Sequence, residues 1–183
     1  YCENCEILRL TAINDYGKIV GRSSTGGFLY DGENCTHIKG SNPRDINNHG
    51  QIVGENGTQF GFLEYGNTFV SMEYPGGVLR TEAAGINDDG LIVGYYSSDN
   101  LNIRHGFLYD GDTYSTLDYP GATYTFLYDI NNLGQIIANI SLNGKSYGAL
   151  ITPVESVPEP ATMLLFGVGL LGVEVFRRKF QKQ

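Results

Sequence analysis

The sequence of 183 residues contains no tryptophan, only two methionines and three cysteines, and few charged side chains. It has no Gly-rich phosphate loop, no His-Glu-x-x-His and no Gly-x-Ser-x-Gly, which argues against the corresponding nucleotide, zinc and serine-hydrolase chemistries. Before residue 155 there are 17 acids and 8 bases, without a basic cluster. Phosphate neutralisation requires Lys and Arg, so we expect no nucleic-acid partner.

The abundant residues are those of turns and pleated sheets. The chain has 25 glycines and 13 tyrosines, and asparagine is frequent. Gly and Asn favour turns, and Tyr favours half-buried strands. The composition therefore predicts an all-β protein with many tight turns.

The cysteines leave several interpretations open. Cys2-x-x-Cys5 has the spacing of redox and zinc motifs, but no second Cys or His pair follows, so we expect neither a metal nor a cofactor. An oxidising export compartment permits a Cys5–Cys35 or Cys2–Cys35 disulfide. Ordinary thiols and a terminal scar are the alternatives. The start lacks Met and a basic-then-apolar leader, which favours a mature terminus or a truncated gene product.

One motif, Ile-Asn-x-x-Gly followed by two apolar residues, occurs four times. The copies occupy residues 13–21, 46–54, 86–94 and 130–138, and the last copy is the most divergent. A second box, Gly-Phe-Leu followed by Tyr or Glu, begins at Gly27, Gly61 and Gly106, with Gly148-Ala149-Leu150-Ile151 as a decayed fourth copy. A third box, residues 73–77, returns at residues 118–122.

Each box has a physical interpretation. Asn opens a short turn between two strands through its side chain, and Gly supplies the left-handed conformation. Phe-Leu-Tyr is predicted to be a third strand, closed by the Asp-Gly turns at residues 31–32 and 110–111. Residues 113–119 alternate as a fourth strand. Four short antiparallel strands per unit of about 40 residues are typical of a β-propeller blade.

These boxes resemble the bacterial extracellular repeat family named for its His-Ala-Phe box. The resemblance covers roughly residues 8–152 and implies propeller blades, although the naming His survives only as His105. We therefore predict a β-repeat domain of about four units over residues 1–152, propeller-like and either closed, open or truncated. Residues 3–14 are the candidate to complete a blade with the far end of the chain. A β-prism and a curved sheet array are alternatives.

The C-terminal segment has a different composition. A linker at residues 153–160 ends in Val157-Pro158-Glu159-Pro160. Residues 161–176 are apolar except Thr162 and Glu174, and a basic tail at 177–183 carries Arg177, Arg178, Lys179 and Lys182. The apolar run would make a helix of ~24 Å, short for a ~30 Å hydrocarbon core. Its glycines and the following cations favour a single transmembrane helix with a cytoplasmic tail.

This order of parts closely resembles the PEP-CTERM sorting signal of exported Gram-negative proteins. The resemblance implies recognition near Pro158-Glu159-Pro160 by an exosortase, a membrane-embedded cysteine transpeptidase-like enzyme. It also implies inner-membrane anchoring before processing, and then residence at the cell surface or in the extracellular matrix. Glu174, close to the predicted cytoplasmic end, departs from the usual pattern.

The sequence contains no clear set of catalytic or metal-binding residues. His37, His49 and His105 occupy unmatched repeat positions, which favours packing or surface roles. The Asn and Asp residues of the repeated turns offer oxygen ligands, but calcium needs six to eight oxygens, so turn chemistry is favoured. The tyrosines would pack within strands or, if exposed together, stack on sugars.

The sequence thus predicts an exported surface or exopolysaccharide-associated protein with a structural or binding role and no enzymatic activity. Its expected partners are the exosortase and the membrane, with exopolysaccharide as a candidate. One alternative is a glycan-binding module with Tyr-rich loops. The other is a propeller hydrolase, for which only Asp45 and Asp129, each before an Ile-Asn pair, supply suitable acids.

Overall fold

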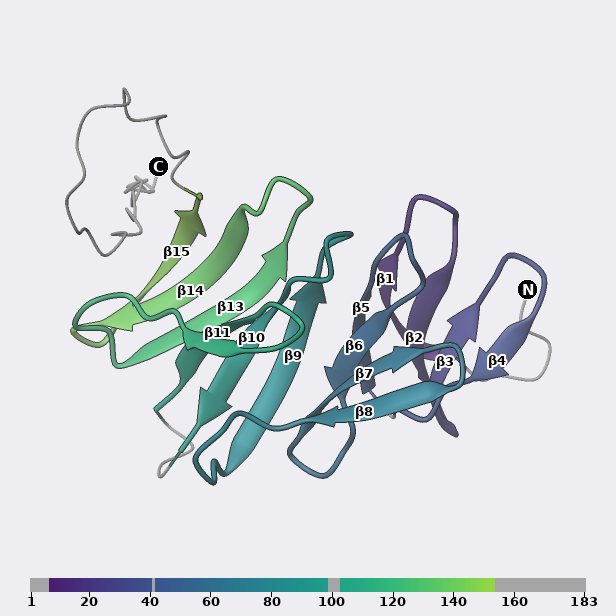
Figure 1. The fold of residues 1–183 in the computed structure, drawn as a ribbon, viewed down its shortest axis with the longest axis horizontal. Helices are drawn as coiled ribbons and strands as arrows, with labels where there is room; N and C mark the ends of the chain where they lie inside the picture. Colours follow the sequence, from purple (N-terminus) through teal and green to yellow (C-terminus); the bar gives the residue numbers. More distant parts are fainter. Residues whose placement is uncertain (1–6, 41, 99–102, 154–183) are drawn as a thin grey trace, which may run out of the picture.

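The computed structural model describes residues 7–40, 42–98 and 103–153, and this part of the chain is built from strands and turns. Every strand pairing is antiparallel, and successive strands form four sheets that follow one another in chain order (Figure 1). The predicted all-β class is therefore confirmed.

Three sheets have four strands and the last has three. The first sheet contains β1 (Ile7–Ile13), β2 (Ile19–Ser23), β3 (Gly26–Tyr30) and β4 (Cys35–His37). The second contains β5 (Asn42–Ile46), β6 (Ile52–Glu55), β7 (Gly61–Tyr65) and β8 (Thr68–Met72). The third contains β9 (Arg80–Ile86), β10 (Ile92–Ser97), β11 (His105–Tyr109) and β12 (Tyr114–Thr116). The fourth contains β13 (Tyr124–Ile130), β14 (Ile136–Leu142) and β15 (Lys145–Ile151).

The repeated motif forms the turn between the first and second strands of every sheet. In the first copy, Asn14 Oδ1 accepts hydrogen bonds from the backbone N–H groups of Tyr16 and Lys18, at 3.1 and 3.0 Å. The glycine that ends each turn has a φ between +72° and +80°. A side chain with a Cβ is disfavoured there, so the predicted roles of Asn and Gly are confirmed. We call these four turns, which begin at Asn14, Asn47, Asn87 and Asn131, the Asn turns.

A β-bulge interrupts the first strand of each sheet. The pairing register shifts by one residue, which leaves Thr11, Arg44, Ala84 and Tyr128 without a cross-strand partner. A bulge adds a residue to one strand and redirects the side chains around it. The bulges occur at equivalent positions, so they affect the same part of all four first strands.

The glycine after each Ile-Val pair fits against a phenylalanine of the third strand. Gly94 is directly opposite Phe107, and a Cβ added to Gly94 would lie 3.0 Å from the Phe107 ring and overlap the carbonyl of Glu82. The fourth sheet places Ala138 opposite Ala149 instead. In the fourth copy Ala149 stands where the other copies have phenylalanine, and the space left by the missing ring accommodates the methyl group of Ala138.

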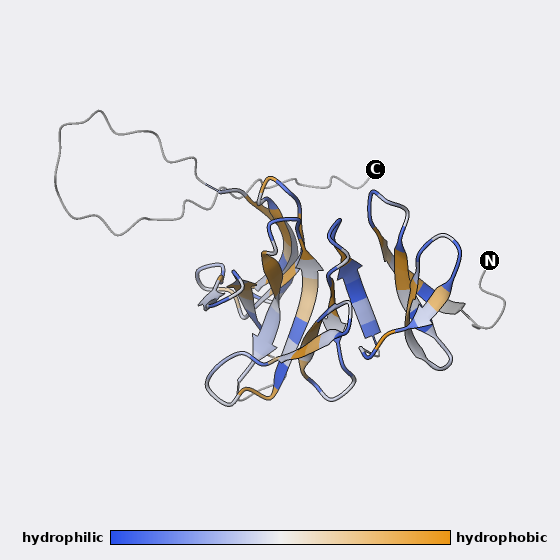
Figure 2. Ribbon diagram, turned by 45° about the vertical axis from the view of Figure 1, so that its right-hand side comes forward, coloured by the Kyte–Doolittle hydropathy of each residue, from blue (hydrophilic) through white to orange (hydrophobic). Residues whose placement is uncertain are grey.

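Neighbouring sheets pack face to face and bury three apolar clusters between them. The first and second sheets share Val20, Ile46, Ile52 and Phe62, all less than 5% exposed. Corresponding clusters centre on Phe107 between the second and third sheets and on Leu127 between the third and fourth. Figure 2 shows hydrophobic residues concentrated in the strands, with hydrophilic residues mainly in the connecting loops. The core is thus a series of interfaces between sheets.

Two strand predictions need correction. The fourth strand of the third sheet covers Tyr114–Thr116 rather than 113–119, because the Asp118 carboxylate accepts the Gly106 N–H at 2.9 Å beyond that point. The predicted pairing of the N-terminal strand with the far end of the chain is wrong for residues 7–13. That strand pairs with β2, which the short turn at Asn14 brings alongside it. Among the described residues no strand follows β15, as expected for the fourth repeat.

The predicted transmembrane helix at 161–176 and basic tail at 177–183 lie outside the described residues, as does the linker after Pro153. Within the described ranges, the structure contains no helix of the length and apolar character needed to span a bilayer. The four sheets form no closed barrel or ring within these ranges, because apolar residues of the first and fourth sheets stay exposed.

Candidate functional site

The first strands of all four sheets line one pocket, which we call the central pocket. Its volume is about 220 Å³. Residues from β1, β5, β9 and β13 contribute, among them all four bulge residues. The lining consists of Arg9, Leu10, Thr11, Arg44, Glu82, Ala84, Phe126 and Tyr128. The repeated bulge therefore directs equivalent side chains from four repeats to one place.

Glu82 is the most enclosed charged residue of this pocket, with 2% exposure. Its Oε1 lies 2.7 Å from Arg44 Nη2, and its Oε2 lies 2.9 Å from Arg80 Nη2. The same Oε2 accepts a hydrogen bond from the Tyr95 hydroxyl at 3.0 Å. Burial, and then the adjacent Glu82 carboxylate, raise the pKa of Tyr95 to about 12. Two arginines and a hydroxyl thus compensate one buried carboxylate.

Cations gather around the pocket although the body is acidic. Four of the eight bases before residue 155 are Arg9, Arg44, Arg80 and Arg104. Arg104 lies over the rings of Tyr95 and Phe126, 5.0 and 6.0 Å from their centroids. Arg9 is exposed and forms no ion pair with any described residue.

Aromatic rings form one wall of the central pocket. The centroids of Phe126 and Tyr128 are 4.2 Å apart, and Tyr128 is 44% exposed. Phe126 in turn packs against Tyr95 at 4.5 Å. An exposed ring packed against a half-buried one offers an apolar face with little freedom to lose on binding.

Asp45 and Asp129, the acids predicted for a hydrolase, both contact β9. Asp45 accepts the backbone N–H groups of Ile46 and Ile86, each at 2.8 Å. A Cβ on Gly85 would lie 2.9 Å from Asp129 Oδ1. Burial, opposed by these hydrogen bonds and aided by Asp129, raises the pKa of Asp45 to about 6. Burial also raises the pKa of Asp129. Both carboxylate oxygens of Asp45 accept backbone hydrogen bonds, and the bond from Ile86 connects the second sheet to the third.

Several of the tyrosines pack against each other. Tyr74 stacks on Tyr96 at 3.7 Å, and Tyr114 packs edge-on against Tyr74 at 5.3 Å. The hydroxyls of Tyr74 and Tyr96 both approach Thr116 Oγ1, at 2.8 and 3.1 Å. Tyr109 joins the same cluster, while Tyr30 bonds the carbonyl of Gly32. Tyr128, on the wall of the central pocket, lies outside this cluster and packs against Phe126.

The remaining candidates are structural. His105 Nδ1 lies 2.6 Å from Asp118 Oδ2, and His37 Nε2 lies 3.4 Å from Thr25 Oγ1. In the part of the chain that the structure describes, no three His, Cys, Asp or Glu side chains are grouped as a metal site would require. Cys35 is disulfide-bonded, in agreement with one of the expectations for the cysteines.

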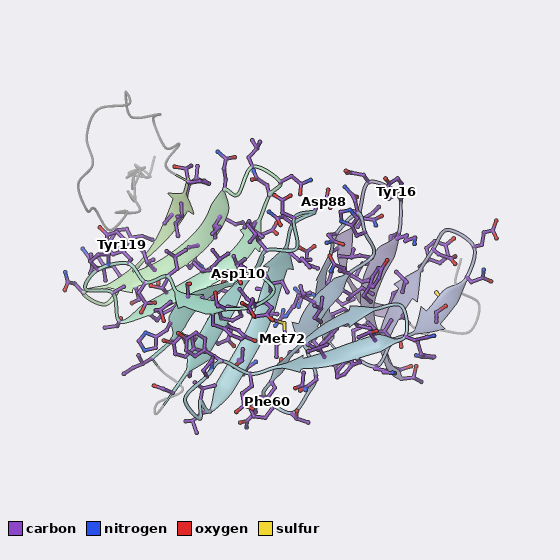
Figure 3. The ribbon with its side chains drawn as sticks, in the orientation of Figure 1. Tyr16, Phe60, Met72, Asp88, Asp110 and Tyr119 are labelled. Atoms are coloured by element: carbon purple, nitrogen blue, oxygen red, sulfur yellow. The ribbon has the colours of Figure 1, made fainter. Side chains whose placement is uncertain are left out.

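The Asn turns are joined along one rim by hydrogen bonds between sheets. Asn14 Nδ2 donates to the Asn47 carbonyl at 3.0 Å, and Asn47 Nδ2 donates to the Asn87 carbonyl at 2.9 Å. Asn87 Nδ2 continues the series to the Asn131 carbonyl at 3.3 Å. Figure 3 shows Tyr16 and Asp88, from two of these turns, on the same rim. The carbonyls of Asn47, Asn87 and Asn131 thus accept hydrogen bonds from the preceding turn.

A second series connects the residues that follow these asparagines. The backbone N–H of Asp15 donates to Asn48 Oδ1 at 2.9 Å, and that of Asn48 donates to Asp88 Oδ1 at 2.8 Å. The Asp88 N–H then donates to Asn132 Oδ1 at 2.9 Å. In both series the donor belongs to the earlier sheet. We call the two series together the Asn ladder.

Sequence reasoning missed the central pocket because nothing in the repeats marks the bulges. A weak signal existed, since Arg9, Arg44 and Arg80 all lie in the first strands of their repeats. The described residues therefore define an all-β protein of repeated sheets around a cationic and aromatic pocket.

The comparisons with known proteins identify the end of the chain. Residues 156–179 match the model of the PEP-CTERM protein-sorting motif. The match contains the predicted motif Val157-Pro158-Glu159-Pro160 and the cations Arg177, Arg178 and Lys179, and Lys182 follows it. These residues lie outside the described part. No curated protein matches the chain. The sorting signal implies an exported, exosortase-targeted surface protein of a Gram-negative bacterium.

Proposed function

We propose that this exported protein binds an acidic polysaccharide of the cell surface or its matrix through the central pocket. The observation that carries the proposal is the convergence of the exposed Arg9 with the exposed ring of Tyr128 in an otherwise acidic body, beside Arg44, which pairs with Glu82. Guanidinium groups form bidentate hydrogen bonds with carboxylates, and aromatic faces stack on sugar rings. The pocket volume of about 220 Å³ suits a sugar residue or chain end rather than a larger ligand.

Export and architecture support this proposal. The sorting motif implies delivery to the surface, and a disulfide at Cys35 suits an oxidising compartment. We take the four sheets to be blades of an open propeller built from His-Ala-Phe-type repeats. In that arrangement the first strands are innermost, and the pocket occupies the position of a propeller's central channel.

Binding is tested with the full chain in non-ionic detergent by calorimetric titration. The ligands are uronic-acid oligosaccharides and neutral hexose oligosaccharides of equal length. Arg9→Gln and Tyr128→Ala are expected to weaken uronide binding at least tenfold. Lys145→Gln and Tyr65→Ala, which change exposed residues outside the pocket, are the matched controls. Equal binding of neutral chains, or equal losses in the control variants, would contradict the proposal.

We propose binding without catalysis. The hydrolase alternative would have to use Asp129, because both oxygens of Asp45 accept backbone hydrogen bonds. Incubation of the protein with the same oligosaccharides should release no new reducing ends. Turnover that disappears in Asp129→Asn would establish the hydrolase alternative instead.

A further inference from the structure

The outward faces of the first and fourth sheets expose positions that are buried in every internal interface. Ile13 is 65% exposed, whereas its equivalents Ile46, Ile86 and Ile130 are each 4% exposed. At the other end, Ile137 is 51% exposed and its equivalents Val20, Val53 and Val93 are 0% exposed. We call the outward side of the first sheet the leading face and that of the fourth sheet the trailing face.

These two apolar faces are complementary halves of the same interface. The Ile13 position always packs toward the preceding sheet, and the Ile137 position packs toward the following sheet. Leu150 also lies on the trailing face and is 40% exposed, whereas its equivalents pack in the internal interfaces: Leu29, Leu63 and Leu108. Each face thus carries the residues that its missing neighbour would cover.

The Asn ladder ends in a donor at one face and an acceptor at the other. The carbonyls of Asn47, Asn87 and Asn131 each accept two hydrogen bonds, one from the turn glycine and one from the preceding sheet. Among the described residues, the Asn14 carbonyl accepts only from Gly17. At the trailing face, the one described partner of Asn131 Nδ2 is Gln135 Oε1 of the same turn, at 2.8 Å. The trailing face therefore supplies the donor that the leading face lacks.

Acids and amides alternate along the same rim. Asp15, Asn48, Asp88 and Asn132 occupy equivalent turn positions, and the amide of Asn48 bonds the carboxylates on both sides at 2.7 and 2.9 Å. Asn132 bonds Asp88 at 2.7 Å. A trailing face placed against a leading face would continue the alternation with Asn132 beside Asp15. Two leading faces together would oppose Asp15 to Asp15, a repulsive contact.

The carboxylates of the first strands alternate in the same way. Asp45 in the second sheet accepts the Ile86 N–H of the third sheet through Oδ2. Asp129 occupies the equivalent position in the fourth sheet and bonds its own Ile130 N–H through Oδ1, as Asp45 bonds Ile46. Its Oδ2 has no partner among the described residues. The position equivalent to Ile86 in the first sheet is Ile13, on the leading face. A junction between the fourth and first sheets would therefore repeat the junction between the second and third.

We propose that the trailing face of one molecule binds the leading face of a second copy, so that the chain assembles head to tail through the contacts that join its own sheets. The interface is heterologous, because it pairs two different surfaces. The inference is independent of sugar binding in the central pocket.

The test uses two full-length variants that block opposite faces, Ile13→Asp and Ile137→Asp. Both side chains are mostly exposed, so neither change disturbs an internal interface. The proteins are kept in non-ionic detergent because of the apolar run at residues 161–176, and their mass is measured by light scattering over a concentration series. Asp129→Ala, which removes the trailing acceptor, is expected to raise the dissociation constant about tenfold.

Wild-type protein should associate with rising concentration, and each blocked variant alone should stay monomeric. An equimolar mixture of the two variants should form a dimer, because each retains the face that the other has lost. A monomeric wild type would overturn the proposal. Association unaffected by either variant would place the contact elsewhere, for example in the apolar run, and an unassociated mixture would rule out the head-to-tail pairing.

Discussion

Replacement of Asn47 should reveal how much the Asn ladder contributes to the stability of the fold. Asn47 is 4% exposed, and its side chain takes part in four hydrogen bonds. Oδ1 accepts from the N–H groups of His49 and Gln51 at 3.1 and 3.0 Å. Nδ2 donates to Gln51 Oε1 at 2.6 Å and to the Asn87 carbonyl at 2.9 Å. Three of the bonds thus hold the turn, and one joins the second sheet to the third.

At about 1 kcal/mol for each hydrogen bond, Asn47→Ala should lower the free energy of unfolding by about 4 kcal/mol. This is a large share of the 5–15 kcal/mol typical of a domain. At a pH where the new acid is neutral, Asn47→Asp keeps both accepted bonds and can donate one bond through its O–H, so it should cost only about a quarter as much. Intermediate stability of this variant would separate the turn from the contact between sheets.

The matched control is Asn131→Ala, in the last Asn turn. Asn131 makes the same bonds within its turn but donates to no following sheet, and it is exposed to water. Its loss should cost only about 1 kcal/mol, because water replaces its partners. Urea unfolding of the full chain in mild non-ionic detergent, followed by the near-ultraviolet signal of its tyrosines, measures both variants. Equal losses at Asn47 and Asn131 would refute the stabilising role of the ladder.

Three further predictions concern packing, protonation and sorting. Gly94→Ala should destabilise the fold by about 1–3 kcal/mol because its Cβ would meet the Glu82 carbonyl and the Phe107 ring, whereas Gly148→Ala, with open space around it, should be neutral in the same unfolding assay. The pKa of Asp45 is raised from 3.8 to about 6, so the folded state binds the proton more tightly than the unfolded state, and the free energy of unfolding should fall by about 3 kcal/mol as pH rises from about 4 to about 6. A pH series of melting temperatures measures this slope, which should disappear in Asp45→Asn. An unchanged slope in that variant would assign it to another group. Glu159→Ala in the sorting motif should leave the unprocessed chain in the inner membrane, as seen by fractionation and mass spectrometry. Normal processing of this variant would show that the exosortase does not need Glu159.

The strands and turns could be predicted from the sequence because each has a local chemical marker. The Asn and Gly of each Asn turn and the Asp-Gly turns at residues 31–32 and 110–111 fix where strands end, and the structure places them there. The extent of β12 was overestimated because Asp118, through its side chain, replaces a backbone partner of Gly106. Alternation of residue types does not reveal such a substitution.

The central pocket could not be predicted because it depends on contacts between repeats. No glycine or proline marks the bulge residue Tyr128, and its exposure depends on strands far away in the sequence. Similarly, Glu82 appears in the sequence as an ordinary polar strand residue. Its burial results from Arg44 of the preceding sheet and Arg80 of its own strand. The repeats specify the sheets, while the differences between repeats specify the site.

The three-stranded fourth sheet has a mechanical consequence for a body held at the cell surface by its C-terminal end. Tension along such a tether reaches the described body at Pro153 and Ile151, the end of β15. β15 is an edge strand bonded only to β14, so a pulling force separates it one hydrogen bond at a time rather than shearing the whole ladder. The fourth sheet should thus yield first under flow and extend the tether, while the three sheets beyond it keep their shape.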